Sequence, residues 1–154
     1  MVETARGNGS RPPVVAIPMS TDALTPFLEA TQTVAIITTR ADGTEVATPI
    51  WSVAADGAGY VRSYLGPGAG WFKRAVSGRP VSFSLENGTV AERDPVAALN
   101  TRRTPVTVEL VAGDELVHEP VSDEFLRKYA RWPQDVAPMV VEPALQATLR
   151  VLPA

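Results

Sequence analysis

The sequence has no cysteine and only one histidine, His118, among its 154 residues. The absence of cysteine excludes disulfides, iron–sulfur clusters, thiolate zinc sites and a cysteine nucleophile. A single histidine cannot form a metal cluster of several histidines, and it leaves only one candidate base for a Ser-His-Asp triad. We therefore expect no metal site. We interpret His118 as a surface residue at the end of a strand. The sequence alone identifies no catalytic residue.

Long apolar runs and an excess of positive charge are also missing. No stretch approaches the roughly 20 apolar residues of a membrane span, and the N-terminal MVETARGNGSRPP lacks the apolar core of a signal peptide. The net charge of -3 argues against a partner that carries as many phosphates as a nucleic acid. We therefore predict a cytoplasmic protein with a small-molecule substrate and with neither nucleic acid nor membrane as a partner.

The chain does contain many short runs of alternating or β-branched apolar residues, which are typical of strands. The predicted strands are residues 33–39, 45–54, 60–65, 81–85, 105–110 and 147–152. Asp-Gly pairs at 42–43 and 56–57 supply turns between the first three. Asn87-Gly88 is the strongest hairpin signal in the sequence, and it predicts a type I′ turn into a further strand over residues 89–93.

Short helices are predicted in three places. Thr25 and Pro26 have the residue types of an N-cap and a first helical position, residues 71–77 form one or two turns, and Ser122 has the residue type of an N-cap. The fold class is therefore β-rich α+β, an antiparallel barrel of six or seven strands with two or three short helices. We predict a flexible N-terminal tail over residues 1–20 and a single domain over residues 21–154.

The segment from Tyr60 to Arg74 has the pattern of an anion site. A strand ends in Arg62 and Ser63, a glycine-rich loop follows, and a helix then begins. Glycines let backbone N–H groups approach an anion closely, and a helix start adds positive charge. The glycine spacing matches neither the dinucleotide-binding nor the Walker pattern. The segment indicates a phosphate site, and the alternative is a glycine-rich loop with ordinary surface cations.

These elements together resemble the FMN/F420-binding split-barrel superfamily, which includes pyridoxamine phosphate oxidase-like proteins. The resemblance rests on the Thr48-Pro49-Ile50-Trp51 element of the second strand, the third strand that ends at Ser63, and Arg79-Pro80 before a later strand. Trp71-Phe72 followed by Arg79-Pro80 is similar to the deazaflavin-dependent nitroreductases. The Tyr-Val-Arg-Ser and Trp-Phe-Lys runs, with Lys128-Tyr129, look like an uncharacterised bacterial family, DUF2255.

The resemblance implies a split barrel that binds FMN or F420 at the interface of a homodimer. The implied cofactor-binding residues are Thr48, Pro49, Ile50, Trp51, Arg62, Ser63, Trp71, Lys73 and Arg74. The first four would line the ring, Trp71 would pack at the edge of the site, and the other four would hold the phosphate. The implied function is a flavin- or deazaflavin-linked oxidoreductase that acts on a small organic substrate, with the hydride chemistry supplied by the cofactor ring.

Two alternatives stay open. Gly70 and Phe72 stand where the oxidase-type branch has a serine and a lysine, so the cofactor could have been lost. The protein would then be a cofactor-free enzyme of the cyclase or isomerase type on the same barrel. It could also be a non-catalytic protein that binds a cofactor or another ligand without turnover.

Overall fold

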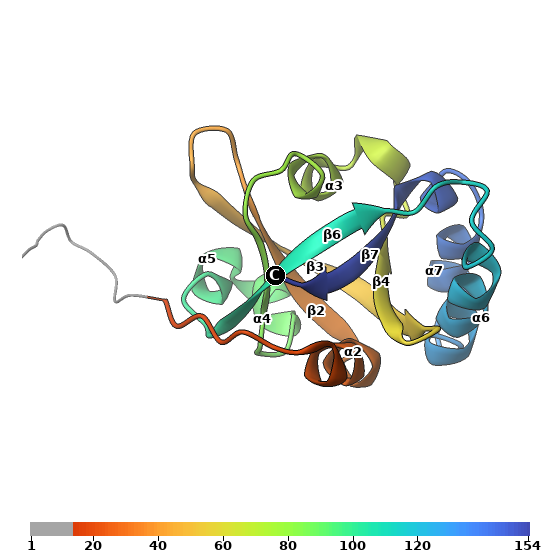
Figure 1. The fold of residues 1–154 in the computed structure, drawn as a ribbon, viewed down its shortest axis with the longest axis horizontal. Helices are drawn as coiled ribbons and strands as arrows, with labels where there is room; N and C mark the ends of the chain where they lie inside the picture. The colour runs from red at the N-terminus through yellow and green to blue at the C-terminus, as the bar shows by residue number, and fades with distance from the viewer. Residues whose placement is uncertain (1–13) are drawn as a thin grey trace, which may run out of the picture.

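Six strands close into a barrel in the computed structural model, which describes residues 14–154 (Figure 1). The strands are β2 (Thr33–Thr39), β3 (Glu45–Ala55), β4 (Ala58–Arg62), β5 (Val81–Ser84), β6 (Arg103–Leu110) and β7 (Thr148–Pro153). They follow one another around the barrel in the order β2-β3-β4-β7-β6-β5, and every pair is antiparallel. The predicted antiparallel split barrel is therefore confirmed.

Short helices cover the barrel from several sides. They are α2 (Thr21–Ala30), α3 (Gly70–Ala75), α4 (Thr89–Arg93), α5 (Pro95–Ala98), α6 (His118–Lys128) and α7 (Pro133–Val136), with 3-10 turns η1 (Gly66–Gly68), η2 (Ala137–Val140) and η3 (Ala144–Ala147). Figure 1 shows α6 and α7 on one side of the barrel and α4 and α5 on the other. No helix among residues 14–154 combines the length and apolar character needed to cross a membrane.

Two predicted helix starts are wrong. Helix α2 begins at Thr21, so Pro26 lies inside it, where its ring costs one backbone hydrogen bond. Burial of Leu24 and Leu28 against the barrel holds the helix in spite of this loss. Helix α6 begins at His118 rather than after Ser122. Ser122 lies inside the helix, where its hydroxyl accepts a hydrogen bond from Arg62.

Strand β2 is buried along nearly its whole length because both of its faces are covered. Val34 and Ile36 belong to the main core together with Phe83 of β5. Ala35 and Ile37, on the opposite face, pack in a separate cluster with residues of α4 and α5. A continuous apolar run, rather than strict alternation, is what a strand with two buried faces requires.

The barrel is split between β3 and β4. These strands pair from Ala55–Ala58 up to Ser52–Val61, and the pairing ends there. Beyond that point β3 continues as the partner of β2 alone, from Trp51 to Glu45. Pro49 lies in this half-paired stretch, where the absence of an N–H group is tolerated because one edge of the strand has no strand partner. The split leaves an opening beside residues 48–51.

The predicted tail over residues 1–20 falls partly outside the described residues, which begin at residue 14. Within the described part, Ala16 forms an isolated parallel bridge with Arg103. The Ile17 N–H donates to the Arg103 carbonyl at 2.8 Å, and the Arg103 N–H donates to the Val15 carbonyl at 3.0 Å. The last residues before α2 are therefore tied to β6, and the domain boundary at residue 20 stays a prediction.

The predicted hairpin at Asn87-Gly88 is wrong. Residues 89–93 form helix α4 instead of a strand, and Gly88 has a φ of -63° rather than the positive value that a type I′ turn needs. The Asn87 side chain accepts a hydrogen bond from the Thr89 N–H at 3.0 Å, so it caps the local turn. A Cβ at Gly88 would lie 2.6 Å from the carbonyl carbon of Val34. This glycine is therefore needed for close approach to β2.

We predict that Gly88→Ala destabilises the protein although its φ is ordinary for alanine. The added methyl group meets backbone atoms of β2, and overpacking of this kind costs about 1–3 kcal/mol. Thermal unfolding should show a melting temperature lower by roughly 2–12 °C. Gly113→Ala is the control, because a Cβ there meets nothing within 4 Å. Equal melting temperatures for the two variants would contradict the role of close packing.

Candidate functional site

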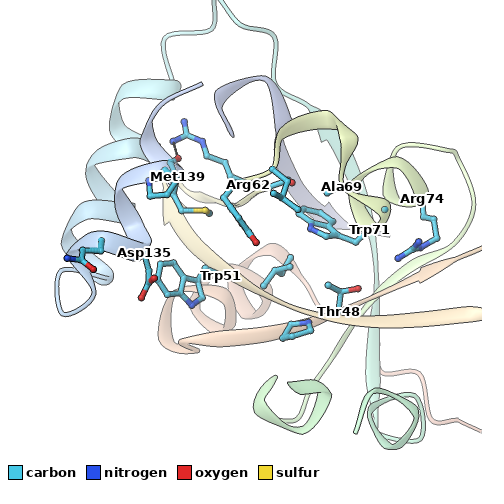
Figure 2. A pocket seen from close by; sticks show the side chains of 16 residues that line it. Thr48, Trp51, Arg62, Ala69, Trp71, Arg74, Asp135 and Met139 are labelled. Carbon is cyan, nitrogen blue, oxygen red and sulfur yellow. Dashed lines mark hydrogen bonds between the residues drawn. The ribbon is translucent and has the colours of Figure 1, made fainter. Parts of the chain in front are cut away.

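A pocket of about 730 Å³ opens at the split between β3 and β4. This volume lies within the roughly 300–1,000 Å³ of small-molecule sites. Eight of the nine predicted site residues line it: Thr48, Pro49, Ile50, Trp51, Arg62, Ser63, Trp71 and Arg74. Lys73 does not line the pocket, because it is exposed on α3. Figure 2 shows the indoles of Trp51 and Trp71 on opposite sides of the pocket.

The C-terminal third of the chain supplies the wall that the sequence did not predict. Gln134 and Asp135 of α7 and Pro138 and Met139 of η2 all line the pocket. These residues lie in two very short helical turns that carry no periodic apolar signal. Only the packing of α7 and η2 beside the barrel brings them to the site, so no local sequence pattern could have identified them.

Trp51 is held in place from one side by aromatic stacking. Its ring lies 3.9 Å from the ring of Tyr129, centroid to centroid, with the planes 7° apart. The buried Tyr129 hydroxyl donates to the Gln32 carbonyl at 2.5 Å and accepts from the Ser52 N–H at 3.1 Å. Burial raises the pKa of Tyr129, so its hydroxyl stays protonated. Trp51 therefore presents a fixed indole to the pocket.

Lys128 stabilises the position of Tyr129, which stacks on Trp51. Its Nζ donates to three carbonyl oxygens, those of Leu28 at 2.8 Å, Thr31 at 2.8 Å and Ser52 at 2.6 Å. Burial lowers the pKa of Lys128 to about 8. The three bonds join α6 to the end of α2 and to β3, and they fix the position of the adjoining Tyr129.

Two polar groups beside the pocket have no partner within the described part of the chain. Trp71 is 8 % exposed and makes an edge contact with Phe72, but its indole N–H donates to no residue between 14 and 154. The hydroxyl of the buried Ser63 likewise makes no hydrogen bond among these residues. Buried tryptophan N–H groups normally find a partner. Both groups are therefore available to a bound molecule.

Arg62 is buried, and its guanidinium uses every N–H inside the protein. Nε donates to Thr148 Oγ1 at 2.9 Å, Nη1 to Ser122 Oγ at 2.8 Å and to the Met139 carbonyl at 3.1 Å. Nη2 donates to Nδ1 and to the carbonyl oxygen of His118, both at 3.2 Å. Figure 2 shows this guanidinium turned away from Trp71.

The single histidine is engaged in the same network. Since Arg62 can only donate, His118 Nδ1 accepts, and Nε2 carries the proton that it donates to the Ala112 carbonyl at 2.8 Å. Burial lowers the pKa of Arg62 to about 10, which leaves it charged at neutral pH. Arg62 therefore builds the pocket wall and has no donor left for a phosphate.

Arg74 lines the pocket with a guanidinium group whose terminal nitrogens are available to a ligand. Its Nε donates to Thr38 Oγ1 at 2.9 Å, and its two terminal nitrogens form no hydrogen bond with residues 14–154. Burial lowers the pKa of Arg74, and the charges of Arg40 and Arg79 lower it further. A Cβ at Gly70 would lie 3.0 Å from Arg74 Nη1, so the glycine at this position makes room for the guanidinium.

Asp135 gives the pocket a charge of the opposite sign. Figure 2 shows it on the Trp51 side, far from Arg74. The described residues contain no group of three or more histidine, cysteine, aspartate or glutamate side chains that could hold a metal ion. The pocket thus has an apolar, aromatic middle, with a carboxylate on one side and a guanidinium on the other.

Comparison with known proteins identifies a family and a fold. A family model described as an uncharacterised protein conserved in bacteria, DUF2255, matches residues 26–151. No curated protein sequence matches the chain.

Several solved structures share its fold at low sequence identity. ChuZ of Campylobacter jejuni is 13% identical over 86% of this chain, with a TM-score of 0.58, and this chain spans about half (51%) of the length of ChuZ. HutZ, the heme storage protein of Vibrio cholerae, is 14% identical over 88% of this chain and 92% of its own, with a TM-score of 0.55. Conserved hypothetical protein Rv2991 of Mycobacterium tuberculosis is 17% identical over 92% and 83%, with a TM-score of 0.52.

We predict that Arg62→Met destabilises the fold by about 3 kcal/mol or more, because it leaves several buried acceptors without a donor. Urea unfolding followed by tryptophan fluorescence measures the change. Arg102→Met is the control, since Arg102 is exposed and, among residues 14–154, its side chain pairs only with Glu86, at 3.4 Å. A surface pair of this kind contributes at most about 1 kcal/mol. Similar unfolding midpoints for both variants would contradict the structural role of Arg62.

Proposed function

This chain belongs to the DUF2255 family, and we propose that it binds a flavin or deazaflavin, FMN or F420, in the pocket at the barrel split. We further propose that it works as an oxidoreductase on a small organic substrate. The observation that carries the proposal is that two indoles and a free guanidinium end line one apolar pocket. A flat ring with an anionic tail is the ligand chemistry that suits this combination.

The ring would occupy the aromatic part of the pocket. Thr48, Pro49, Ile50 and Trp51 offer a strand edge and an indole whose far face is already covered by Tyr129. Trp71 closes the opposite side. Offset stacking of aromatic rings contributes about 0.5–1.5 kcal/mol beyond burial of area. A rigid indole wall favours a planar ligand over a flexible one.

The phosphate would lie toward Arg74. The groups that could bind it are the terminal nitrogens of Arg74, the Ser63 hydroxyl and the Trp71 indole N–H, none of which has a partner among residues 14–154. Arg62 and Lys73 are left out of this role, the first because its donors are used and the second because it does not line the pocket.

The chain's own residues would bind and orient the ring and keep water away from it. When bound, a flavin or deazaflavin supplies hydride transfer by itself. Asp135 lines the pocket on the Trp51 side and could exchange a proton with a substrate there. The surrounding apolar wall, which includes Ile50 and Met139, would exclude solvent from the reacting face.

Haem binding is the second candidate, because the similarly folded HutZ is a heme storage protein. Haem iron is normally held by histidine, cysteine, methionine or tyrosine. The pocket wall contains neither histidine nor cysteine, and His118 is bound to Arg62 and Ala112. Met139 and Tyr64 are the remaining ligand types on the wall. The flavin proposal therefore fits the described residues better.

The absorption spectrum of the protein, purified from a host that makes FMN, F420 and haem, tests the proposal directly. We expect flavin or deazaflavin bands. A Soret band would favour the haem candidate. A colourless protein that binds none of the three on titration would contradict the proposal and favour a cofactor-free enzyme or a binder of another ligand.

We predict that Arg74→Ala weakens FMN binding by about tenfold to a hundredfold, since hydrogen bonds between charged groups contribute about 1.5–3 kcal/mol. Lys73→Ala is the matched control: it removes the same charge one residue away but outside the pocket. Riboflavin, which lacks the phosphate, should respond little to either change. Fluorescence titration of the unmodified protein and of both variants, each with FMN and with riboflavin, measures the affinities. Equal losses with FMN and riboflavin would mean that Arg74 does not contact the phosphate.

We also predict a homodimer. Tyr64 and Leu65 are 57 % and 61 % exposed at the pocket mouth, where a partner would bury them. Light scattering should give the mass of a dimer at micromolar concentration, and Leu65→Glu should shift it toward the monomer. Leu116→Glu is the control, because Leu116 is exposed but does not line the pocket. A monomer with and without FMN would rule out an interfacial site.

A further inference from the structure

Three arginines meet at the end of β2, beside the pocket. Arg74 Nε donates to the Thr38 hydroxyl at 2.9 Å, and Arg79 Nε donates to the Thr39 carbonyl at 2.8 Å. Arg40 is the next residue in the chain. The end of β2 therefore brings together guanidinium groups from the residue after β2, from α3 and from the segment before β5.

The three positive charges have no carboxylate partner in an ion pair among residues 14–154. Asp42 is the nearest acid in the sequence. One of its oxygens accepts from both the N–H and the hydroxyl of Thr44, at 2.9 and 2.7 Å, and these bonds, with a smaller contribution from the charge of Arg40, lower the pKa of Asp42. Asp42 therefore offsets part of the charge of Arg40, but the two form no ion pair. The charges of Arg40 and Arg79 help to lower the pKa of Arg74, which is the expected effect of like charges held close together.

The free donors of the cluster are the ends of the guanidinium groups. The Nε atoms of Arg74 and Arg79 are used to anchor the side chains, while their terminal nitrogens bind no other described residue. Arg40 makes a single 3.3 Å hydrogen bond, from Nη1 to the Thr44 hydroxyl. Anchoring through Nε leaves the forked end of a guanidinium available, and that fork matches the oxygens of a phosphate.

We propose that Arg40, Arg74 and Arg79 form a binding site for a diphosphate group. A diphosphate has more oxygen atoms, spread over a greater length, than a single phosphate, so it can accept from more of these three forked donors at once. Arg74 also lines the pocket, whereas Arg40 and Arg79 lie outside it. The diphosphate would therefore belong to a flavin whose tail leaves the pocket past Arg74, such as FAD, since neither FMN nor F420 carries a diphosphate. This last step rests on the proposed function, but the anion site itself does not.

Titration calorimetry of the full chain with inorganic pyrophosphate at low salt tests the anion site. We expect Arg40→Gln and Arg79→Gln each to weaken binding by about tenfold, because each removes a charged hydrogen-bonding partner. Arg93→Gln is the matched control, since Arg93 is exposed on α4, outside both the cluster and the pocket, and should bind like the unmodified protein. Melting temperatures check that the variants fold, and Arg79→Lys, which keeps the charge, should restore part of the affinity.

Two flavins separate this inference from the proposed function. FAD, which carries a diphosphate, should lose affinity in Arg40→Gln, whereas FMN should not. Pyrophosphate binding that depends on Arg40 and Arg79 without any flavin binding would support the anion site and contradict the flavin proposal. No pyrophosphate binding, or equal binding by the unmodified protein and both glutamine variants, would overturn the anion site. Tighter binding of a single-stranded DNA oligonucleotide at the same arginines would overturn its assignment to a small molecule.

Discussion

The buried guanidinium of Arg62 is the interaction on which the geometry of the site depends. No carboxylate of residues 14–154 lies at hydrogen-bonding distance from it, and its five N–H groups donate to neutral acceptors from β7, α6 and η2. A buried charge is tolerated only when its hydrogen bonds are complete. All three elements must therefore be in position at once. This requirement couples the barrel to the helices that carry Asp135 and Met139, and so fixes one wall of the pocket relative to the other.

The opposite wall follows from the early end of pairing between β3 and β4. Strand β3 continues to Glu45 as the partner of β2, while the chain beyond β4 turns away at Ser63 toward α3. The stretch from Thr48 to Trp51 is thereby left beside an opening, with Trp51 supported by Tyr129 and Lys128. The pocket is thus a consequence of strand topology, and the aromatic residues decide what it can accept.

Residue patterns predicted the strands well, because each strand carries its own apolar signal along the chain. The errors arose where a distant contact overrides a local preference. Asn87-Gly88 has the residue types of a tight hairpin, yet glycine is needed at position 88 because the backbone there lies too close to Val34 for a Cβ atom. Ser122 has the residue type of a helix cap, yet it accepts a bond from Arg62. The number of free donors on Arg62 and the exposure of Lys73 depend on packing, and no local pattern contains that information.

The fold alone does not decide the ligand, since one barrel can support several chemistries. The residues that line the pocket distinguish between possible ligands better than the fold does. Iron in a haem would need an axial ligand. The one histidine of the chain does not line the pocket and is bound to Arg62 and Ala112, which leaves Met139 and Tyr64 as the ligand types on the wall. For the proposed flavin or deazaflavin, a flat apolar surface and a cation for its phosphate are enough, and Trp51, Trp71 and Arg74 would serve these purposes. All N–H groups of Arg62 donate within the fold, so Arg74 is the arginine of the pocket wall that is left to bind an anion. The arginines gathered behind it at the end of β2 extend the positive charge in the direction in which an anionic tail would leave the pocket.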